Sequence, residues 1–272
     1  MKLTNFHIAI CIAILIGWSF LGFSQDQQSN PQGQDLNPYN SVTGGISIRP
    51  IFPSKIFGNG LITFESGDAS KVNFQVQHKI SYSAGAIIRR SFTKLLSIET
   101  GLSYTRRAYT MKVSDPLINN VPFNIDYRTV SFGIPVQALV SVQLSKKIFS
   151  TVGLGLAADF YPSNILVKEG TSYNVGGLRT SFIGGSLMVN LGFEYRTKKD
   201  GIIYLGGMYN RPFANYLYNE ITYFQSNGNV IQNGTELSGS YFAIDFRYYL
   251  QPSIIKKKEK KKSKKGKKEF TY

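Results

Sequence analysis

The segment 240–250 places an acid and a base, Asp245 and Arg247, two residues apart. On a β-strand such residues point to the same face, because side chains alternate with a period of two. The pair could serve catalysis or transport, or it could be a structural ion pair. The opposite face is apolar and aromatic, with Phe242, Ile244, Phe246, Tyr248 and Leu250. This combination is wrong for a dry core but suits a barrel with a wet interior and a lipid-facing outside.

Other alternating segments carry charged residues with the same inward parity. The predicted inward set is Arg49, Arg89, Glu99, Arg107, Asp159, Glu194, Arg196, Asp245 and Arg247. Arginines and acids are mixed within it. We therefore expect a network of paired charges that fills the interior, in preference to a catalytic or transport role.

The sequence offers few other groups for catalysis. His78 is the only histidine after the apolar N-terminal segment, and its parity predicts an outward position near a rim. The run 184–188, Gly-Gly-Ser-Leu-Met, lacks the closing glycine of a nucleophile elbow. Cys11, the only cysteine, lies in the apolar N-terminal segment, and a single histidine remains after it. The usual cysteine and histidine metal-ligand sets therefore cannot form. We expect no enzyme activity, no catalytic, cofactor or metal site and no cofactor. A lipid-modifying barrel enzyme would need a rim serine, His78 and one acid.

Eight segments alternate consistently enough to be strands: 42–52, 72–92, 96–109, 129–144, 150–161, 181–196, 202–210 and 240–250. The second is about twice the length that a strand needs to cross a bilayer, so one end should project into water. Pro135 removes a ladder donor from the fourth segment, which predicts a local bulge. In the seventh segment we assign Ile203, Leu205 and Tyr209 outward, although Ile202, Tyr204 and Met208 are also apolar.

The connections alternate between short turns and long loops. The short ones lie around 93–94, 145–147 and 198–201, and the long ones at 53–71, 110–128, 162–180 and 211–239. In an antiparallel meander this order puts every long loop at one end, as in bacterial outer-membrane barrels. The predicted fold is all-β, an eight-stranded antiparallel up-and-down transmembrane barrel with an interior that side chains can fill. A soluble lipocalin-like barrel would invert the two faces.

The ends of the chain suggest its location. Lys2, an apolar run at 8–21 and the small-x-small end Gly22-Phe23-Ser24 predict a signal peptide at 1–24, in preference to an uncleaved anchor. A polar periplasmic linker at 25–40 and the barrel at 41–250 follow. An even strand number leaves both termini on the short-turn side. We therefore expect a bacterial outer-membrane location with the termini in the periplasm.

The segment 251–272 is predicted to be a disordered basic tail, since 256–269 holds ten lysines against two glutamates. It could be a solvated tail or a tether to anionic periplasmic surfaces, either cell-wall polymer or lipid. Nucleic-acid binding is disfavoured, because an exported chain rarely meets nucleic acid and no aromatic platform is interleaved. The lysines are Lys256, Lys257, Lys258, Lys260, Lys261, Lys262, Lys264, Lys265, Lys267 and Lys268.

Three features together resemble the outer-membrane β-barrel proteins of Bacteroidetes, a group that includes PorT-like proteins. They are the strand at 130–142 containing Ile134-Pro135, the run Val-Gly-Leu-Gly-Leu at 152–156 after a lysine-containing turn, and an aromatic closing strand. The resemblance covers about 41–250 and implies a link to type IX secretion and gliding. We expect a non-enzymatic structural or interaction module with extracellular binding loops and a tail that could tether it to cell wall or envelope proteins. The alternatives are a narrow channel and the lipid-modifying enzyme.

Overall fold

The computed structural model describes residues 41–52, 61–66, 71–118, 123–169, 173–197 and 201–250. All of these belong to one compact unit, Leu36–Tyr272. The predicted signal peptide, the linker at 25–40 and the basic tail lie outside the described residues. Within the described residues, no helix is long and apolar enough to span a membrane.

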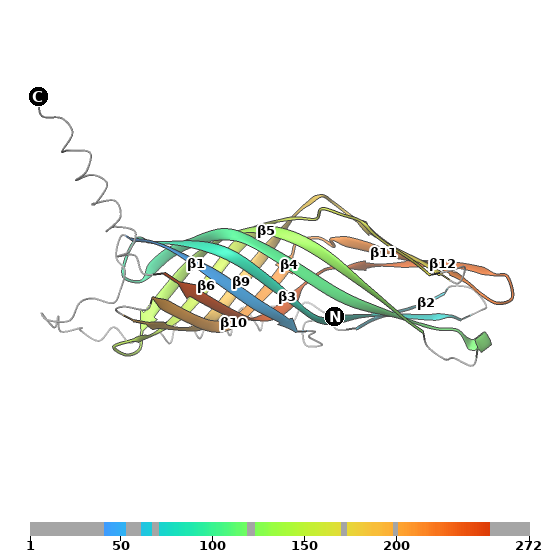
Figure 1. Ribbon diagram of the computed structural model, residues 1–272, viewed down its shortest axis with the longest axis horizontal. Coiled ribbons are helices and arrows are strands. Elements are labelled where there is room, and N and C mark those ends of the chain that lie inside the picture. Colours follow the sequence, from blue (N-terminus) through green and yellow to red (C-terminus); the bar gives the residue numbers. More distant parts are fainter. Residues whose placement is uncertain are drawn as a thin grey trace, which may run out of the picture. The chain divides into compact units, whose positions relative to one another are not determined.

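Eight strands close into an antiparallel barrel (Figure 1), which confirms the predicted all-β fold class. The last strand pairs with the first, and the first also pairs with the next barrel strand along the chain, so the ring has no free edge. The barrel strands are β1 (Ser41–Phe52), β3 (Asn73–Ser91), β4 (Leu96–Ser114), β5 (Phe123–Gln143), β6 (Ile148–Phe160), β9 (Ile183–Arg196), β10 (Ile202–Pro212) and β13 (Tyr241–Tyr249).

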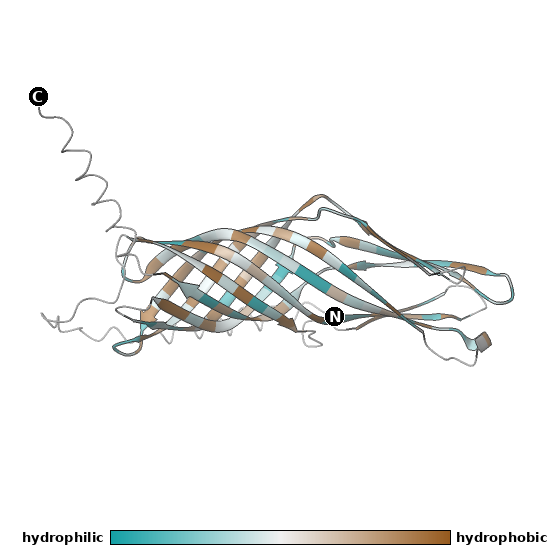
Figure 2. Cartoon of the chain, viewed as in Figure 1, coloured by the Kyte–Doolittle hydropathy of each residue, from teal (hydrophilic) through white to brown (hydrophobic). Residues whose placement is uncertain are grey.

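The barrel has an apolar outside and a polar inside, because its strands alternate in hydropathy along their length (Figure 2). Ile46, Leu154 and Phe193 are more than half exposed, at 54%, 58% and 59%. Serines, threonines and charged residues at the intervening positions are buried. In β10 the exposed residues include Ile203 and Leu205, as assigned from the sequence, whereas Ile202, Tyr204 and Met208 are buried.

Five further strands lie in regions that the sequence analysis treated as loops. They are β2 (Leu61–Glu65), β7 (Ile165–Glu169), β8 (Tyr173–Arg179), β11 (Leu217–Phe224) and β12 (Val230–Leu237), and a short 3-10 helix follows β4 at Pro116–Ile118. β2 pairs with the extended part of β3, and the other four form a separate sheet in the order β12-β11-β8-β7. The described parts of the long connections at this end are therefore largely folded into strands.

The extended ends of β3, β4 and β5 share an apolar core with the four-stranded sheet. Phe74, Met111 and Ile125 lie in one buried cluster with Val175 and Ile221. We call this part of the molecule the projection (Figure 1). The inward face of β3, β4 and β5 is thus polar within the barrel and apolar within the projection. Burial of these apolar side chains stabilises the projection.

A β-bulge in β3 separates the two parts. Lys79 pairs with Ala108 whereas Tyr82 pairs with Arg106, so β3 has one extra residue between them. The Ser81 hydroxyl holds the bulge, since it accepts the Ala108 N–H at 2.9 Å and donates to the Lys79 carbonyl at 2.9 Å. The bulge switches the inward parity of the strand.

This switch overturns one prediction from the sequence. The sequence analysis placed the even positions of 72–92 outward throughout, and with them His78. Beyond the bulge the even positions point inward instead, so Val72, Phe74 and Val76 are buried in the core of the projection and His78 is only 5% exposed.

The bulge predicted at Pro135 is absent. β4 and β5 keep one register on both sides of the proline, with Thr100 opposite Val136 and Ser103 opposite Gly133. The Thr100 hydroxyl donates to the Pro135 carbonyl at 2.8 Å. This side-chain bond secures β4 to β5 at the point where proline lacks an N–H, and no extra residue is needed.

Candidate functional site

The structure places all nine predicted inward charges inside the barrel, each no more than 8% exposed. They come from six strands. Arg49 lies on β1, Arg89 on β3, Glu99 and Arg107 on β4, Asp159 on β6, Glu194 and Arg196 on β9, and Asp245 and Arg247 on β13.

Seven of the nine form one continuous chain of alternating charge across the lumen. Each neighbour in this chain is within ion-pair distance of the next. In order, the pairs are Arg49 to Asp245 at 2.9 Å, Asp245 to Arg247 at 2.5 Å, Arg247 to Glu99 at 2.6 Å, Glu99 to Arg89 at 3.4 Å, Arg89 to Glu194 at 2.6 Å and Glu194 to Arg196 at 2.6 Å. We call these seven residues the lumen chain. Four arginines and three acids leave it with one excess positive charge.

Aromatic rings cover three of the four guanidinium groups of the lumen chain, those of Arg89, Arg196 and Arg247. Arg196 lies 3.8 Å from the centre of the Phe149 ring, and Arg89 lies 4.0 Å from that of Tyr249. The Tyr249 hydroxyl also donates to Glu99 and accepts from Arg89. Arginine suits this setting because it is weakly hydrated, stacks on rings and stays charged. Paired charges and aromatic rings therefore extend across the lumen.

A pair of glycines makes room for one of these rings. Gly206 lies opposite Gly192 in the β10–β9 ladder. A Cβ on Gly206 would collide with the Tyr204 hydroxyl and with the Leu191 carbonyl. Without Cβ atoms here, the Tyr204 ring can lie 4.8 Å from the Arg247 guanidinium. Glycine at these two positions thus has a local packing reason.

The remaining two predicted charges lie apart from the lumen chain. Asp159 accepts a hydrogen bond from the Ser186 hydroxyl at 2.7 Å. Arg107 donates to the Ser131 hydroxyl at 2.9 Å, and its guanidinium lies 5.2 Å from the ring centres of both Tyr216 and Tyr241. It has no acidic partner within the part of the chain that the structure describes. Arg107 therefore rests on tyrosine rings in place of a carboxylate.

A tyrosine cluster lies at the junction of the barrel and the projection, and the sequence analysis missed it. The hydroxyls of Tyr109 and Tyr216 are 2.9 Å apart, and the Tyr161 and Tyr216 rings are 5.1 Å apart. Tyr109 shares the inward parity of Arg107, so strand alternation could have identified it. Tyr216 lies in a long connection, for which the sequence offered no inward assignment.

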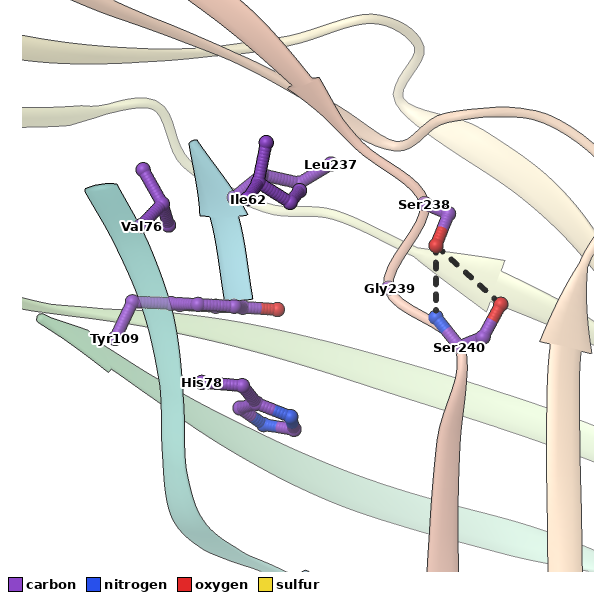
Figure 3. Close-up of a pocket in the computed structure, with 8 residues that line it drawn as sticks. All are labelled: Ile62, Val76, His78, Tyr109, Leu237, Ser238, Gly239 and Ser240. Carbon is purple, nitrogen blue, oxygen red and sulfur yellow. Dashed lines mark hydrogen bonds between the residues drawn. The ribbon is translucent and has the colours of Figure 1, made fainter. Parts of the chain in front are cut away.

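His78 lies beside this cluster. It is on the projection side of the band of exposed apolar side chains around the barrel, which we call the apolar belt. Its ring stacks on Tyr109 with centres 5.0 Å apart (Figure 3). Burial, aided by the nearby Arg107 charge, lowers the pKa of His78 to about 4. The neutral ring contacts the Ser81 hydroxyl at 3.2 Å. That hydroxyl already donates its proton to the Lys79 carbonyl, so its oxygen can only accept from His78. The geometry is that of a bulge support and differs from an activated serine.

The space next to His78 is small. A cavity of about 20 Å³ is lined by His78 and Tyr109 together with Ile62, Val76, Leu237, Ser238, Gly239 and Ser240 (Figure 3). This volume holds about one water molecule. Across the described ranges there is also no group of three or more His, Cys, Asp or Glu side chains that could hold a metal ion.

Comparison with known proteins gives only likeness of fold. No protein-family model matches the sequence, and no curated relative matches it. Among solved structures, the chain is similar to the outer membrane protein OprG from Pseudomonas aeruginosa, with a TM-score of 0.45 and 12% identity over 80% of this chain and 100% of that one. It is also similar to the outer membrane protease OmpT from Escherichia coli, with a TM-score of 0.26 and 9% identity over 78% and 94%. At these scores the likeness assigns no activity to this chain.

Proposed function

We propose that the chain is an integral protein of the bacterial outer membrane. The support is the ring of exposed apolar side chains around a closed barrel. Exposure of such a ring is unfavourable in water and favourable in lipid. Tyr82 on β3 and Phe92, which directly follows β3, mark its two edges, and they are 10 residues apart. A tilted transmembrane strand needs about 9–11 residues. Aromatic side chains at such edges are typical of the membrane interface.

The proposed orientation follows from the connections. The turn at 92–95 and the partners Gly45 and Tyr249 lie at the end of the barrel opposite the projection. Outer-membrane barrels have short periplasmic turns and long extracellular segments. In this orientation the projection faces the outside of the cell, and the N-terminal end of β1 and the C-terminal end of β13 both face the periplasm.

We assign the protein a structural or interaction role in the envelope, with the projection as its contact surface. The observation that carries this proposal is the lumen chain, because seven paired charges and the rings over them occupy the space through which ions would have to pass. A folded projection with its own apolar core offers a firmer surface for partners than irregular loops would.

This role is tested by measuring whether the inserted barrel conducts ions. The full-length protein, inserted into planar lipid bilayers at high protein load, should give no discrete conductance steps. Insertion is verified on the same preparation by heat-modifiable migration in gels. Reproducible unitary steps from inserted, folded protein would contradict the proposal and favour the narrow channel.

The basic tail extends the proposal to the periplasm, where it would tether the barrel to anionic cell wall or to an envelope assembly such as the secretion and gliding machinery that PorT-like resemblance implies. The support is its charge, with ten lysines against two glutamates in 256–269. Deletion of 256–272 should reduce retention of the barrel on isolated cell-wall sacculi severalfold without changing its heat-modifiable migration. Equal retention of the deleted and full-length chains would count against the tether.

A further inference from the structure

A basic patch lies on the outer surface of β3, β4 and β5, directly beyond an aromatic edge. The edge consists of Tyr82, Tyr104 and Phe132, whose neighbouring ring centres are 6.2 and 5.7 Å apart. The basic residues follow on the same outward face. They are Arg106, opposite Tyr82, then Lys79 and Arg128, both level with Ala108, and then Lys112, opposite Asn124. We call these four residues the rim patch.

The rim patch is only partly neutralised. Asp126 lies on the same surface and pairs with Lys79 at 2.8 Å, and it also accepts from the Thr110 hydroxyl at 2.6 Å. These hydrogen bonds lower the pKa of Asp126, so the carboxylate stays ionised and holds Lys79. Arg106, Lys112 and Arg128 have no ion-pair partner among the described residues. Four bases and one acid leave a net charge of +3.

Unpaired like charges on neighbouring strands are unfavourable by themselves, because they repel each other. The repulsion is relieved when an external anion binds between them. Arginine is suited to this role, since its planar guanidinium can donate two hydrogen bonds to one phosphate group. Arg106 also lies 5.8 Å from the Tyr82 ring centre, which limits its freedom before any ligand arrives.

The depth of the rim patch identifies the source of the anion. Aromatic edges of membrane barrels lie at the level of the lipid headgroups. Each residue advances a strand by about 3.3 Å. Arg106, Lys79 and Arg128 lie two, three and four residues beyond the edge ring of their own strand, within reach of the phosphate layer. Lys112 lies eight residues beyond Tyr104 and extends the patch farther out along β4. Soluble anions would require no such alignment with the apolar belt.

We propose that the rim patch binds the phosphate groups of anionic lipids in the leaflet next to the projection. This inference rests on the proposed membrane location. The contact would fix the height of the barrel in the bilayer and hold the base of the projection against the membrane surface. Each basic residue near an anionic surface adds to the binding, so the three unpaired ones should act together.

The test compares two variants with the same change in charge. The patch variant carries Arg106→Gln, Lys112→Gln and Arg128→Gln, and leaves the Lys79–Asp126 pair intact. The control variant carries Lys94→Gln, Lys146→Gln and Lys147→Gln, which lie in the short turns at the opposite end of the barrel. Native mass spectrometry of the full chain in detergent measures binding of bis-phosphorylated lipid A and of the same lipid without its phosphates.

The wild type and the control variant should prefer the phosphorylated lipid, and the patch variant should bind it about tenfold or more weakly. Equal weakening in both variants, or equal binding of the lipid without phosphates, would overturn the inference. Displacement of the lipid by millimolar inorganic phosphate would also overturn it, by showing that free phosphate is the ligand. Insertion of each protein into vesicles is assayed separately, so failure of the wild type to insert would count against the membrane location itself.

Discussion

Replacing Glu99 by Gln is expected to destabilise the folded barrel by about 3–5 kcal/mol, which is the usual cost of removing one partner from a buried ion pair. Glu99 occupies the centre of the lumen chain. It contacts Arg247 at 2.6 Å, Arg89 at 3.4 Å and the Tyr249 hydroxyl, and it is completely buried. Glutamine has almost the same shape, so the packing is kept while the charge is lost. The buried guanidinium groups of Arg247 and Arg89 then lose the negative charge of the Glu99 carboxylate, with which both are paired.

The measurement is urea unfolding of the purified protein in phospholipid vesicles. Heat-modifiable migration in gels reports the folded fraction at each urea concentration. Glu65→Gln is the matched control, because Glu65 is an exposed residue of β2 outside the barrel. An exposed substitution of this kind should change the free energy of unfolding by no more than about 0.5 kcal/mol. Equal unfolding curves for the two variants would mean that the lumen chain contributes little to stability.

The barrel itself could be predicted from the sequence because lipid and a wet interior impose opposite demands on alternate residues. In β13 the parity of Asp245 and Arg247 against Phe242 and Ile244 is unbroken. The same parity led to the inward assignment of all nine charges, and each is buried in the structure. A period of two is a strong signal wherever the two faces of a strand meet such different surroundings.

The pairing of these charges could not be predicted in the same way. The parity of a residue in its strand predicts that its side chain points inward. Its ion-pair partners, however, depend on the register and tilt of strands that are far apart in the chain. Glu99 and Arg247 are separated by 148 residues. Asp159 and Arg107 have the same parity signal as the others, yet they are held by hydroxyl groups and tyrosine rings outside the lumen chain.

The bulge in β3 escaped prediction for a different reason. The alternation of Val76, His78, Ile80 and Tyr82 continues through the bulge without a break, so the sequence favours one uniform strand. The bulge changes the inward parity at the point where β3 enters the projection and begins to share a core with the second sheet. That sheet comes from connections whose glycines, asparagines and serines favoured loops, and its strands gain their stability from the shared core with Phe74 and Met111.

Leu154→Arg is the second large effect that we expect. Leu154 lies on β6, six residues from Ile148 and six from Phe160, and its side chain is 58% exposed on the outer face. If this face meets lipid, an arginine at mid-depth should reduce the free energy of unfolding by about 2–4 kcal/mol. If the face meets water, the same substitution on an exposed surface should be close to neutral.

The membrane location is therefore tested most directly by the free energy of unfolding of Leu154→Arg in phospholipid vesicles, measured beside Leu166→Arg. Leu166 is a similarly exposed leucine, at 66%, but it lies on β7 in the projection, outside the apolar belt. The membrane barrel predicts a loss of about 2–4 kcal/mol for Leu154→Arg and no more than about 0.5 kcal/mol for Leu166→Arg. Equal, near-zero changes for both variants would contradict a lipid-facing barrel.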